Sequence, residues 1–367
     1  MLYSSGNMVF QKGNIATETL GYSYTDDSDF ENTNYSFNSE APWSSQIATI
    51  KKVKFNTPLS LNSIAYWFYL AQNLTSIDYT NLNLDNVTNM SYAYYWCGSL
   101  TGSPICGDKV TNMSEAYDYC DNLTGSPVCG PNVIDMHWAY QSCFNLTGSP
   151  VCGPNVTNIA RTYDSCRNLT GSPVCGPNVT NMYGTYGNCR KLTGNPVCGD
   201  KVTDMWGTYD NCQGLTGHPV CGSNVTNMGS AYDNCRNITG NPIYGDKVNN
   251  MSFTYSCCFN LTGSPVCGPN VIVMSGTYYS CNNLTGSPVC GDKVVTMYST
   301  YRDCRNLIGS PVCGPNVTNM SNAYRNCYNL TGSPICGPNV TDMSNAYNFC
   351  FNLTGSPVCG NYVTNMS

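Results

Sequence analysis

Apolar residues recur along most of this chain at every 23rd position. A leucine column runs from Leu100 to Leu353 with one Ile in it, and a tyrosine column runs from Tyr94 to Tyr347 without a break. A cysteine column and a methionine column keep the same period. Such a period is typical of a solenoid, in which each repeat forms one coil and covers the apolar faces of its neighbours.

Within one repeat, a set of apolar residues is spaced by 3, 4, 3 and 3 positions, which is typical of one face of a short helix. In one repeat this set is Val317, Met320, Tyr324, Cys327 and Leu330. Thr318 and Asn319 lie at the start of the helix and are predicted to cap its free amides. The next segment, LTGSPICG, is extended, and Pro334 limits any strand in it to a few residues. A Gly-Pro-Asn or Gly-Asp-Lys triplet then forms a turn.

One coil cannot be stable alone, because burying its apolar side chains releases less free energy than ordering 23 residues costs. Stacking removes this deficit, since every apolar column is then covered on both sides. The sequence therefore predicts an α/β solenoid, leucine-rich-repeat-like in its period. We expect a right-handed coil of about twelve 23-residue units over residues 61–367, each with a short strand and a short helix.

Residues 1–60 do not repeat and are predicted to form an N-terminal capping or attachment region. Ile47–Phe55 is a strand candidate within it. Four acidic residues suit an exposed cover: Asp26, Asp27, Asp29 and Glu31. The other end shows no such cover, because the apolar columns continue to Met366. Residues 340–367 are therefore predicted to stack on a second copy of the chain or on a continuation of it.

The composition narrows the range of functions. Charged residues make up 10% of the chain, and the formal net charge of −6 argues against a nucleic-acid partner, which requires a basic face. The two histidines, His137 and His218, occupy unlike positions in different repeats and are expected to be scattered surface residues. No catalytic set can be assembled around them, so we expect neither enzyme activity nor a cofactor. No apolar run approaches the roughly 18 residues that span a bilayer.

The 24 cysteines are the sharpest chemical feature. One column, Cys97 to Cys350, ends the predicted helices, and a second, Cys106 to Cys359, follows the extended segments. Reduced thiols that fill a tight core are the favoured interpretation. Disulfides between partners nine residues apart are the alternative, although Tyr244 replaces one member of the second column and breaks a strict pairing rule. Metal binding ranks third, because the chain has no Cys-x-x-Cys pair.

Two further repeated features have structural explanations. The tyrosine column lies four residues after Met and three before Cys, so it is predicted to face the core with the hydroxyl at the edge. The many Asn-x-Thr triplets, such as those at Asn122, Asn155 and Asn329, match the glycosylation signal. They recur because the repeat needs Asn and Thr in its turns and caps, and we expect them to be unmodified.

Variable positions indicate a surface. The two residues after each Met and those around the helix-end Cys change from repeat to repeat, so they are predicted to face solvent. Several are aromatic residues or arginines, which are enriched in protein interfaces. The predicted partner-binding stripe comprises Trp138, Phe144, Arg167, Arg190, Trp206, Arg236, Phe259, Arg305, Tyr328 and Phe351. The alternative is that these side chains only cover the junctions between coils.

Part of the first full coil resembles a known repeat family. The segments that carry the resemblance are Tyr66–Asp78 (YWFYLAQNLTSID), Asn86–Ser91 (NVTNMS) and Cys97–Leu100 (CGSL), with Ala41–Ser44 and Ile50–Phe55 before them. They are similar to the BspA-type leucine-rich repeats of bacterial surface proteins. The resemblance extends over roughly residues 40–367. Later repeats depart from it, because they lose three residues and have LTGSP in place of LTSID.

The resemblance implies a non-enzymatic, surface-displayed repeat protein for adhesion or partner binding, on a bacterial surface or a phage virion. The implied partner is a protein or glycan on a host or neighbouring cell. The alternative is a structural fibre or spacer subunit that assembles through residues 340–367. The first residues, MLYSSG, lack the basic start and apolar core of a signal peptide. This favours a virion protein that folds in a reducing cytoplasm, in agreement with reduced cysteines.

Overall fold

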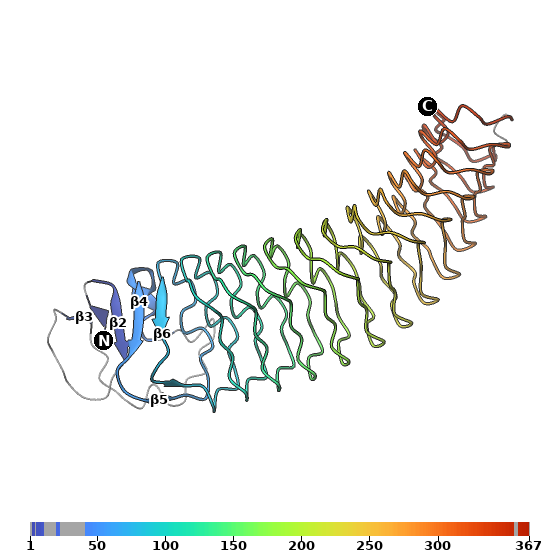
Figure 1. The fold of residues 1–367 in the computed structure, drawn as a ribbon. Helices are drawn as coiled ribbons and strands as arrows, with labels where there is room; N and C mark the ends of the chain where they lie inside the picture. The colour runs from blue at the N-terminus through green and yellow to red at the C-terminus, as the bar shows by residue number, and fades with distance from the viewer. Residues whose placement is uncertain (1, 4, 11–19, 23–40, 356–358, 367) are drawn as a thin grey trace. The chain divides into compact units, whose positions relative to one another are not determined.

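The computed structural model describes residues 2–3, 5–10, 20–22, 41–355 and 359–366. The acidic residues of the predicted cover lie outside the described residues: Asp26, Asp27, Asp29 and Glu31. The chain divides into two compact units, Met1–Val179 and Thr180–Ser367, and each is described by itself. Both units consist of successive coils (Figure 1). The predicted boundary after residue 60 stays a prediction.

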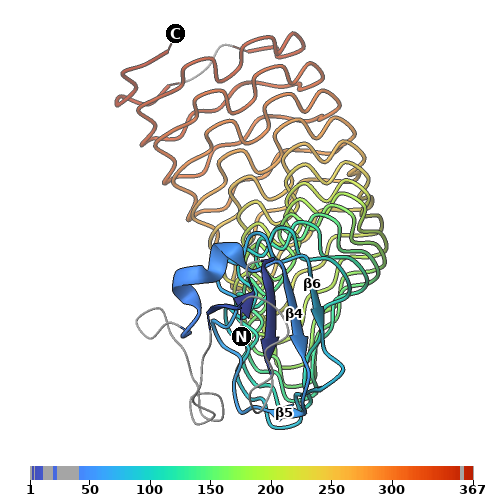
Figure 2. The ribbon, with the colours of Figure 1, turned by 90° about the vertical axis from the view of Figure 1, so that its left-hand side faces the viewer.

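The first unit begins with a five-stranded sheet in the order β3-β1-β2-β4-β6. Its strands are β1 (Leu2–Tyr3), β2 (Asn7–Phe10), β3 (Leu20–Tyr22), β4 (Lys52–Phe55) and β6 (Ser76–Asp78). β4 is the parallel neighbour of both β2 and β6 (Figure 2), so the chain before the repeats extends the sheet of the first coil. The pair β5 (Leu59–Ser60) and β7 (Leu82–Asn83) is also parallel. The strand predicted over Ile47–Phe55 starts later than expected, because Ser44–Thr49 forms the 3-10 helix η2.

Aromatic side chains cover the start of the first coil. Trp43 is fully buried and donates a hydrogen bond from Nε1 to the carbonyl oxygen of Trp67 at 2.7 Å. Phe10 stacks on Phe55 with ring centres 4.9 Å apart and on Trp67 with ring centres 5.5 Å apart. Large aromatic rings contribute much of the buried area in a core. The first coil is therefore closed by rings on its inner side.

The short helix predicted in each coil is wrong for the described residues, which have a chain of turns in its place. Each turn segment contains two residues with a left-handed backbone, for example Glu115 with φ 54° and Tyr119 with φ 58°. A left-handed residue at every fourth position interrupts the i to i−4 bonds of an α-helix. The amides alternate instead: Ala116 N donates to Met113 O at 3.1 Å, whereas Glu115 N donates across to His137 O of the next coil at 3.0 Å.

The strand predicted in each coil is also reduced. After Asn83 the described residues contain no strand, only single parallel bridges such as Asn112 with Asp135. The LTGSP segment forms a backbone bond to the preceding coil from Thr147 N to Gly125 O at 2.8 Å. Glycine and proline account for this, because they weaken or remove the bonds of a strand ladder. The short strand expected in the LTGSP segment is therefore absent after Asn83 in the described residues.

The tyrosine column replaces the missing ladder bonds. The Tyr140 hydroxyl donates to Val128 O at 2.7 Å and accepts from Val128 N at 3.1 Å. The Tyr232 hydroxyl likewise donates to Val220 O at 2.7 Å and accepts from Val220 N at 2.9 Å. Within each unit the rings of neighbouring coils also stack, with centres 5.8 Å apart for Tyr140 and Tyr163 and 5.7 Å for Tyr232 and Tyr255. The prediction that this column faces the core is confirmed, and hydroxyls such as those of Tyr140 and Tyr232 bind the backbone of their own coil.

The repeated apolar columns form the core of each unit. In the first unit, one coil buries Val133, Met136, Tyr140, Cys143 and Leu146, all at 0% exposure. In the second unit, one coil buries Val225, Met228, Tyr232, Cys235 and Ile238, also at 0%. Each unit is therefore a repeat solenoid whose stacked coils share one core, as predicted. No helix among the described residues combines the length and the apolar character needed to cross a bilayer.

Candidate functional site

The predicted partner-binding stripe separates into one regular column and two tryptophans outside it. The column is the position after the buried cysteine of each coil, and its predicted members are Phe144, Arg167, Arg190, Arg236, Phe259, Arg305, Tyr328 and Phe351. All eight side chains are half-buried or exposed. Phe144 and Arg167 belong to the first unit, and the other six belong to the second.

Arginines of this column lie over the aromatic rings of neighbouring coils. The distances from Cζ to the ring centre are 4.7 Å for Arg167–Phe144, 5.6 Å for Arg236–Phe259 and 5.7 Å for Arg305–Tyr328. Each such contact contributes about 0.5–1 kcal/mol at an exposed site. Because the guanidinium covers one ring face, these residues join adjacent coils and also present charge to solvent. Phe351 is the most exposed ring of the column, at 73%.

The two predicted tryptophans lie at other positions of the turn segment. Trp138 has a left-handed backbone with φ 56°, and Arg161 Cζ of the next coil is 6.0 Å from its ring centre. Trp206 lies against Gly229 of the next coil, where an added Cβ atom would be 2.5 Å from the ring. The structure therefore does not place Trp138 and Trp206 in the stripe column. Both cover the junction to the coil that follows.

The expectation that both residues after each Met face solvent is wrong in part. Ser114 and Glu115 are buried, with exposures of 4% and 7%, and Ser299 is buried at 4%. Trp206 and Tyr298, in contrast, are exposed. Glu115 is buried because it is held between side chains of the preceding and the following coil.

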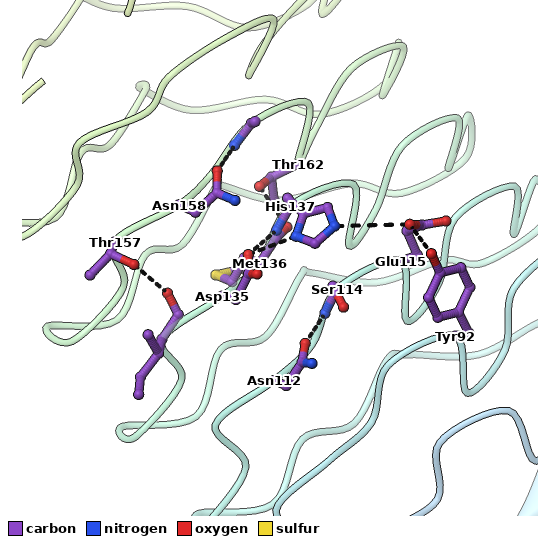
Figure 3. Close-up of polar contacts among 12 residues, drawn as sticks. Tyr92, Asn112, Ser114, Glu115, Asp135, Met136, His137, Thr157, Asn158 and Thr162 are labelled. Carbon is purple, nitrogen blue, oxygen red and sulfur yellow. Dashed lines mark hydrogen bonds and ion pairs between the residues drawn. The ribbon is translucent and has the colours of Figure 1, made fainter. Parts of the chain in front are cut away.

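His137 joins two carboxylates, an arrangement that the sequence did not predict (Figure 3). Its Nδ1 lies 2.8 Å from Asp135 Oδ1, and its Nε2 lies 3.9 Å from Glu115 Oε1 of the preceding coil. The Tyr92 hydroxyl, one coil earlier again, donates to the same Glu115 oxygen. The expectation of a scattered surface histidine is thus wrong for His137. It holds for His218, which is exposed.

Hydrogen bonds and burial set the charges of this network. The hydrogen bond with Asp135 raises the pKa of His137. Burial acts to raise the pKa of Asp135, but the hydrogen bonds from His137 outweigh it and lower that pKa. Burial raises the pKa of Glu115, although the bond from Tyr92 opposes the shift. The arrangement favours a protonated His137 paired with an ionised Asp135.

The network holds protons but contains no activated nucleophile. Burial and the bond to Glu115 raise the pKa of Tyr92, so its phenolate is not formed near neutral pH. Burial also raises the pKa of Cys106 to about 11, which keeps that sulfur protonated and unreactive. In the part of the chain that the structure describes, no three His, Cys, Asp or Glu residues are grouped to hold a metal ion.

A cluster of aromatic side chains lies beside the network in the first coils, and we call it the tyrosine array. Its members are Tyr66, Tyr69, Tyr92, Tyr95, Trp96 and Tyr119. They stack from one coil to the next, with ring centres 4.6 Å apart for Tyr66–Tyr92, 5.1 Å for Tyr69–Tyr95 and 4.9 Å for Trp96–Tyr119. All six are half-buried or exposed. The sequence contains a sign of this cluster that our prediction missed: several tyrosines of the first coils lie outside the core column. They precede Glu115, which is the only glutamate after Glu40.

The two cysteine columns differ in burial. Cys143, of the first column, is fully buried and donates from Sγ to Tyr117 O of the preceding coil at 3.1 Å. Cys129, of the second column, is half-buried, and an added Cβ at Gly153 of the next coil would be 3.0 Å from its Sγ. The structure has all 24 cysteines as thiols, and their reduced state stays a prediction. The second column lines the edge of the core instead of its centre.

The Asn-x-Thr triplets use their amide nitrogens in bonds between coils. Asn145 Nδ2 donates to Asp121 O at 3.0 Å, and Asn155 Nδ2 donates to Pro131 O at 3.1 Å. A glycan attached to either nitrogen would compete with this bond and add bulk at the coil junction. This geometry supports the expectation that the triplets are unmodified.

Comparison with known proteins identifies distant similarities. No protein-family model matches the chain, and no curated protein matches it. Among solved structures, a leucine rich cell surface protein from Faecalibacterium prausnitzii A2-165 is similar with a TM-score of 0.39 and 12% identity, over 96% of this chain and 87% of that chain. The TLR13–ssRNA13 complex is similar with a TM-score of 0.21 and 13% identity, over 91% of this chain and 49% of that chain. These similarities are too low to carry an argument, so the solenoid assignment depends on the bonds between the coils themselves.

Proposed function

We propose that this chain is a surface-displayed, leucine-rich-repeat-like solenoid of the BspA type that binds a partner and catalyses no reaction. The observation that carries the proposal is the division of each coil into two sets of positions. Inward positions hold the same residue types in nearly every repeat, whereas outward positions hold varied aromatic and arginine side chains. Stacking explains the inward set, and recognition of a partner explains the outward set.

The geometry of the stripe column suits recognition. Three of its arginines, Arg167, Arg236 and Arg305, already lie over aromatic rings, so a docking partner would immobilise few additional rotamers there. Aromatic residues and arginines also supply most of the binding energy at protein interfaces. We propose that the stripe column, with Trp138 and Trp206 beside it, contacts a protein or glycan on a host or neighbouring cell. A bacterial surface or a phage virion would display it.

A structural fibre is the second candidate. Residues in the range 340–367 expose large apolar side chains, at 49% for Phe349, 73% for Phe351 and 61% for Met366. Stacking of this coil on another protomer would cover them, as each coil covers the next elsewhere. In that case the outward side chains would only seal the coil junctions.

The two candidates are separated by substitution of the stripe. The stripe variant carries four substitutions: Arg167→Asn, Arg236→Asn, Arg305→Asn and Phe351→Asn. Asn is chosen because Asn282 already occupies this position of the repeat. The labelled chain is titrated onto intact bacterial and animal cells, before and after protease or glycosidase treatment. We expect the variant to lose at least tenfold in cell binding, and the enzyme that abolishes wild-type binding identifies the partner as protein or glycan.

The matched control changes four exposed threonines of the LTGSP segments to Ser: Thr170, Thr239, Thr285 and Thr354. It should bind as the wild type does. Equal binding by the stripe variant would refute the binding role of the stripe. Concentration-dependent oligomers in sedimentation velocity, abolished by Phe349→Asn with Met366→Asn, would establish the fibre instead.

A further inference from the structure

The tyrosine array occupies backbone positions that disfavour large side chains. Tyr66, Tyr92 and Trp96 have φ angles of 58°, 57° and 60°, in the left-handed region that Gly and Asn adopt most readily. In the second unit, most equivalents of Tyr92 and Trp96 are small or amide residues such as Ser230 and Asn234, and rings occur there only singly, at Phe253 and Phe349. Strained positions of this kind persist where the side chain serves a purpose beyond the fold. The rings of the array therefore require an explanation other than stability.

Two acidic side chains lie within the array. Glu115 accepts the hydrogen bond from the Tyr92 hydroxyl, and Asp118 lies one turn later in the same coil. Asp118 is 1% exposed, and its Oδ1 has no hydrogen-bond partner among the described residues. Burial and the charge of Asp118 raise the pKa of Tyr95 to about 12, so the field of this carboxylate reaches the ring. Burial and the charge of Glu115 raise the pKa of Asp118 to about 8, and a cation bound beside the two acids would favour their ionised forms.

Among the residues that the structure describes, no arginine or lysine is recorded over a ring of the array. Aromatic–arginine contacts of the described residues occur elsewhere, at Arg161–Trp138, Arg167–Phe144, Arg236–Phe259, Arg302–Tyr279 and Arg305–Tyr328. Among the described ion pairs, Glu115 meets only His137, at 3.9 Å, and Asp118 meets none. Rings of other coils are thus paired with a guanidinium, whereas the array combines rings and acids.

We propose that the tyrosine array binds an arginine side chain presented by a partner protein, with the guanidinium seated among the tyrosine hydroxyls beside Glu115. The proposal rests on the function proposed above and names one chemical feature of the partner. Arginine fits better than lysine, because its planar group stacks on rings and donates several hydrogen bonds to hydroxyl and carboxylate oxygens. The stacked tyrosines offer a rigid surface that loses little entropy on binding. The array lies wholly within the first unit, apart from most of the stripe.

The test uses the full chain and three labelled nine-residue peptides of Gly and Ser with one central residue: arginine, lysine or citrulline. Citrulline has the shape of arginine without its charge. Fluorescence anisotropy should show the arginine peptide binding at least tenfold more tightly than either of the others. Equal affinities for the arginine and citrulline peptides would overturn the proposal. Lysine binding as tight as arginine would overturn the assignment to a guanidinium.

A paired substitution locates the site. Glu115→Gln with Asp118→Asn should reduce the affinity for the arginine peptide to that for the citrulline peptide. Asp233→Asn is the matched control, because Asp233 occupies the repeat position of Asp118 in the second unit and should leave the affinity unchanged. Full affinity in the folded double variant would refute the role of the carboxylates.

A second variant guards against loss of the fold. Tyr92→Ser with Trp96→Asn introduces the residues that the second unit carries at these positions, so circular dichroism and melting should show intact coils. Binding of the arginine peptide should fall at least tenfold, and unchanged binding would refute the role of the rings. The stripe variant should bind this peptide normally. Loss of cell binding without loss of peptide binding would therefore concern the stripe alone.

Discussion

The first coils of the first unit and the coils of the second unit share one backbone and differ in the side chains placed on it. Both have left-handed residues at the same repeat positions, for example Leu70 with φ 65° and Ser280 with φ 60°. The second unit mostly fills these positions with Gly, Ser, Asn or Asp, which is what the conformation favours. The first coils fill them with rings, a leucine and a glutamate. The difference separates side chains that the fold requires from side chains that it only tolerates.

The inward positions show no such difference. Leu123 in the first unit and Leu215 in the second are both buried, as are Tyr117 and Tyr232. Stacking constrains these positions equally in every coil, because each is covered on both sides. Comparison of the two regions therefore predicts equal effects for inward substitutions and unequal effects for outward ones.

The largest expected effect is common to both regions. Leu123→Ala and Leu215→Ala should each lower the free energy of unfolding by about 2–5 kcal/mol, because each leaves a cavity in a shared core. Urea denaturation of the full chain, followed by near-ultraviolet circular dichroism, measures the loss. The exposed neighbour Thr216 supplies the control as Thr216→Ser. An unchanged melting curve for either leucine variant would count against a core shared by stacked coils.

Removal of the core tyrosine hydroxyls comes next. Tyr117→Phe and Tyr232→Phe should each cost about 1–3 kcal/mol, since the N–H and C=O of Ile105 and Val220 lose their partner. Thermal melting at neutral pH measures the effect. Tyr95→Phe, in the array, is the control and should change stability little. Equal losses of stability in all three variants would contradict a special role for the hydrogen bonds from Tyr117 and Tyr232 to the backbone.

The pH dependence of stability should distinguish the two regions. Burial, reinforced by the charge of Glu115, raises the pKa of Asp118 to about 8. The folded state then keeps a proton that the unfolded chain releases above about pH 4, so stability falls as the pH rises from about 4 to about 8. Asp118→Asn removes this loss and should add about 1–3 kcal/mol at pH 9 and nothing at pH 4.

Asp233→Asn provides the comparison within the second unit. Burial raises the pKa of Asp233, while bonds from Ser256 and from the backbone of Asn234 oppose the shift. Its substitution should therefore act in the same direction with a smaller size. Denaturation series at pH 4, 7 and 9 report both variants, and parallel curves for the wild type and Asp118→Asn would contradict the raised pKa.

The smallest expected effect is a reciprocal exchange at one repeat position. Leu70→Asn should stabilise the chain by about 0.5–1 kcal/mol, because Asn adopts the left-handed region more readily than Leu. Ser280→Leu should destabilise it by about 1 kcal/mol for the converse reason. Differential scanning calorimetry resolves both changes. Stabilisation by both substitutions, or by neither, would remove the strain argument from the array.

The sequence predicted the stacking and the inward columns correctly, and the local backbone incorrectly. The spacing of 3, 4, 3 and 3 residues places Val317, Met320 and Tyr324 on one side of a helix. Turns with a left-handed residue at every fourth position place them on one side as well. The clue that separates the two was present, since Gly207 and Asn211 occupy the two left-handed positions of one coil. Periodicity alone cannot choose between conformations that bury the same face.

The site was predicted less well than the fold. The stripe column follows the period and could be found in the sequence, but Trp138 and Trp206 belong to other positions. In the network of three successive coils, Tyr92 and Glu115 occupy equivalent repeat positions, whereas His137 occupies the preceding position of its repeat. A repeat period relates equivalent positions to one another, and it contains no information on how far one coil is displaced sideways from the next.

The sequence by itself therefore determined which side chains face inward and that the coils stack, because burial of a column is a property of the period. The tertiary structure alone decided what the polar groups do. It assigned the tyrosine hydroxyls to the backbone of the LTGSP segment, and it placed Glu115 between Tyr92 and His137. These contacts depend on the left-handed residues and on the offset between coils, and both are fixed only when the backbone bonds between neighbouring coils have formed.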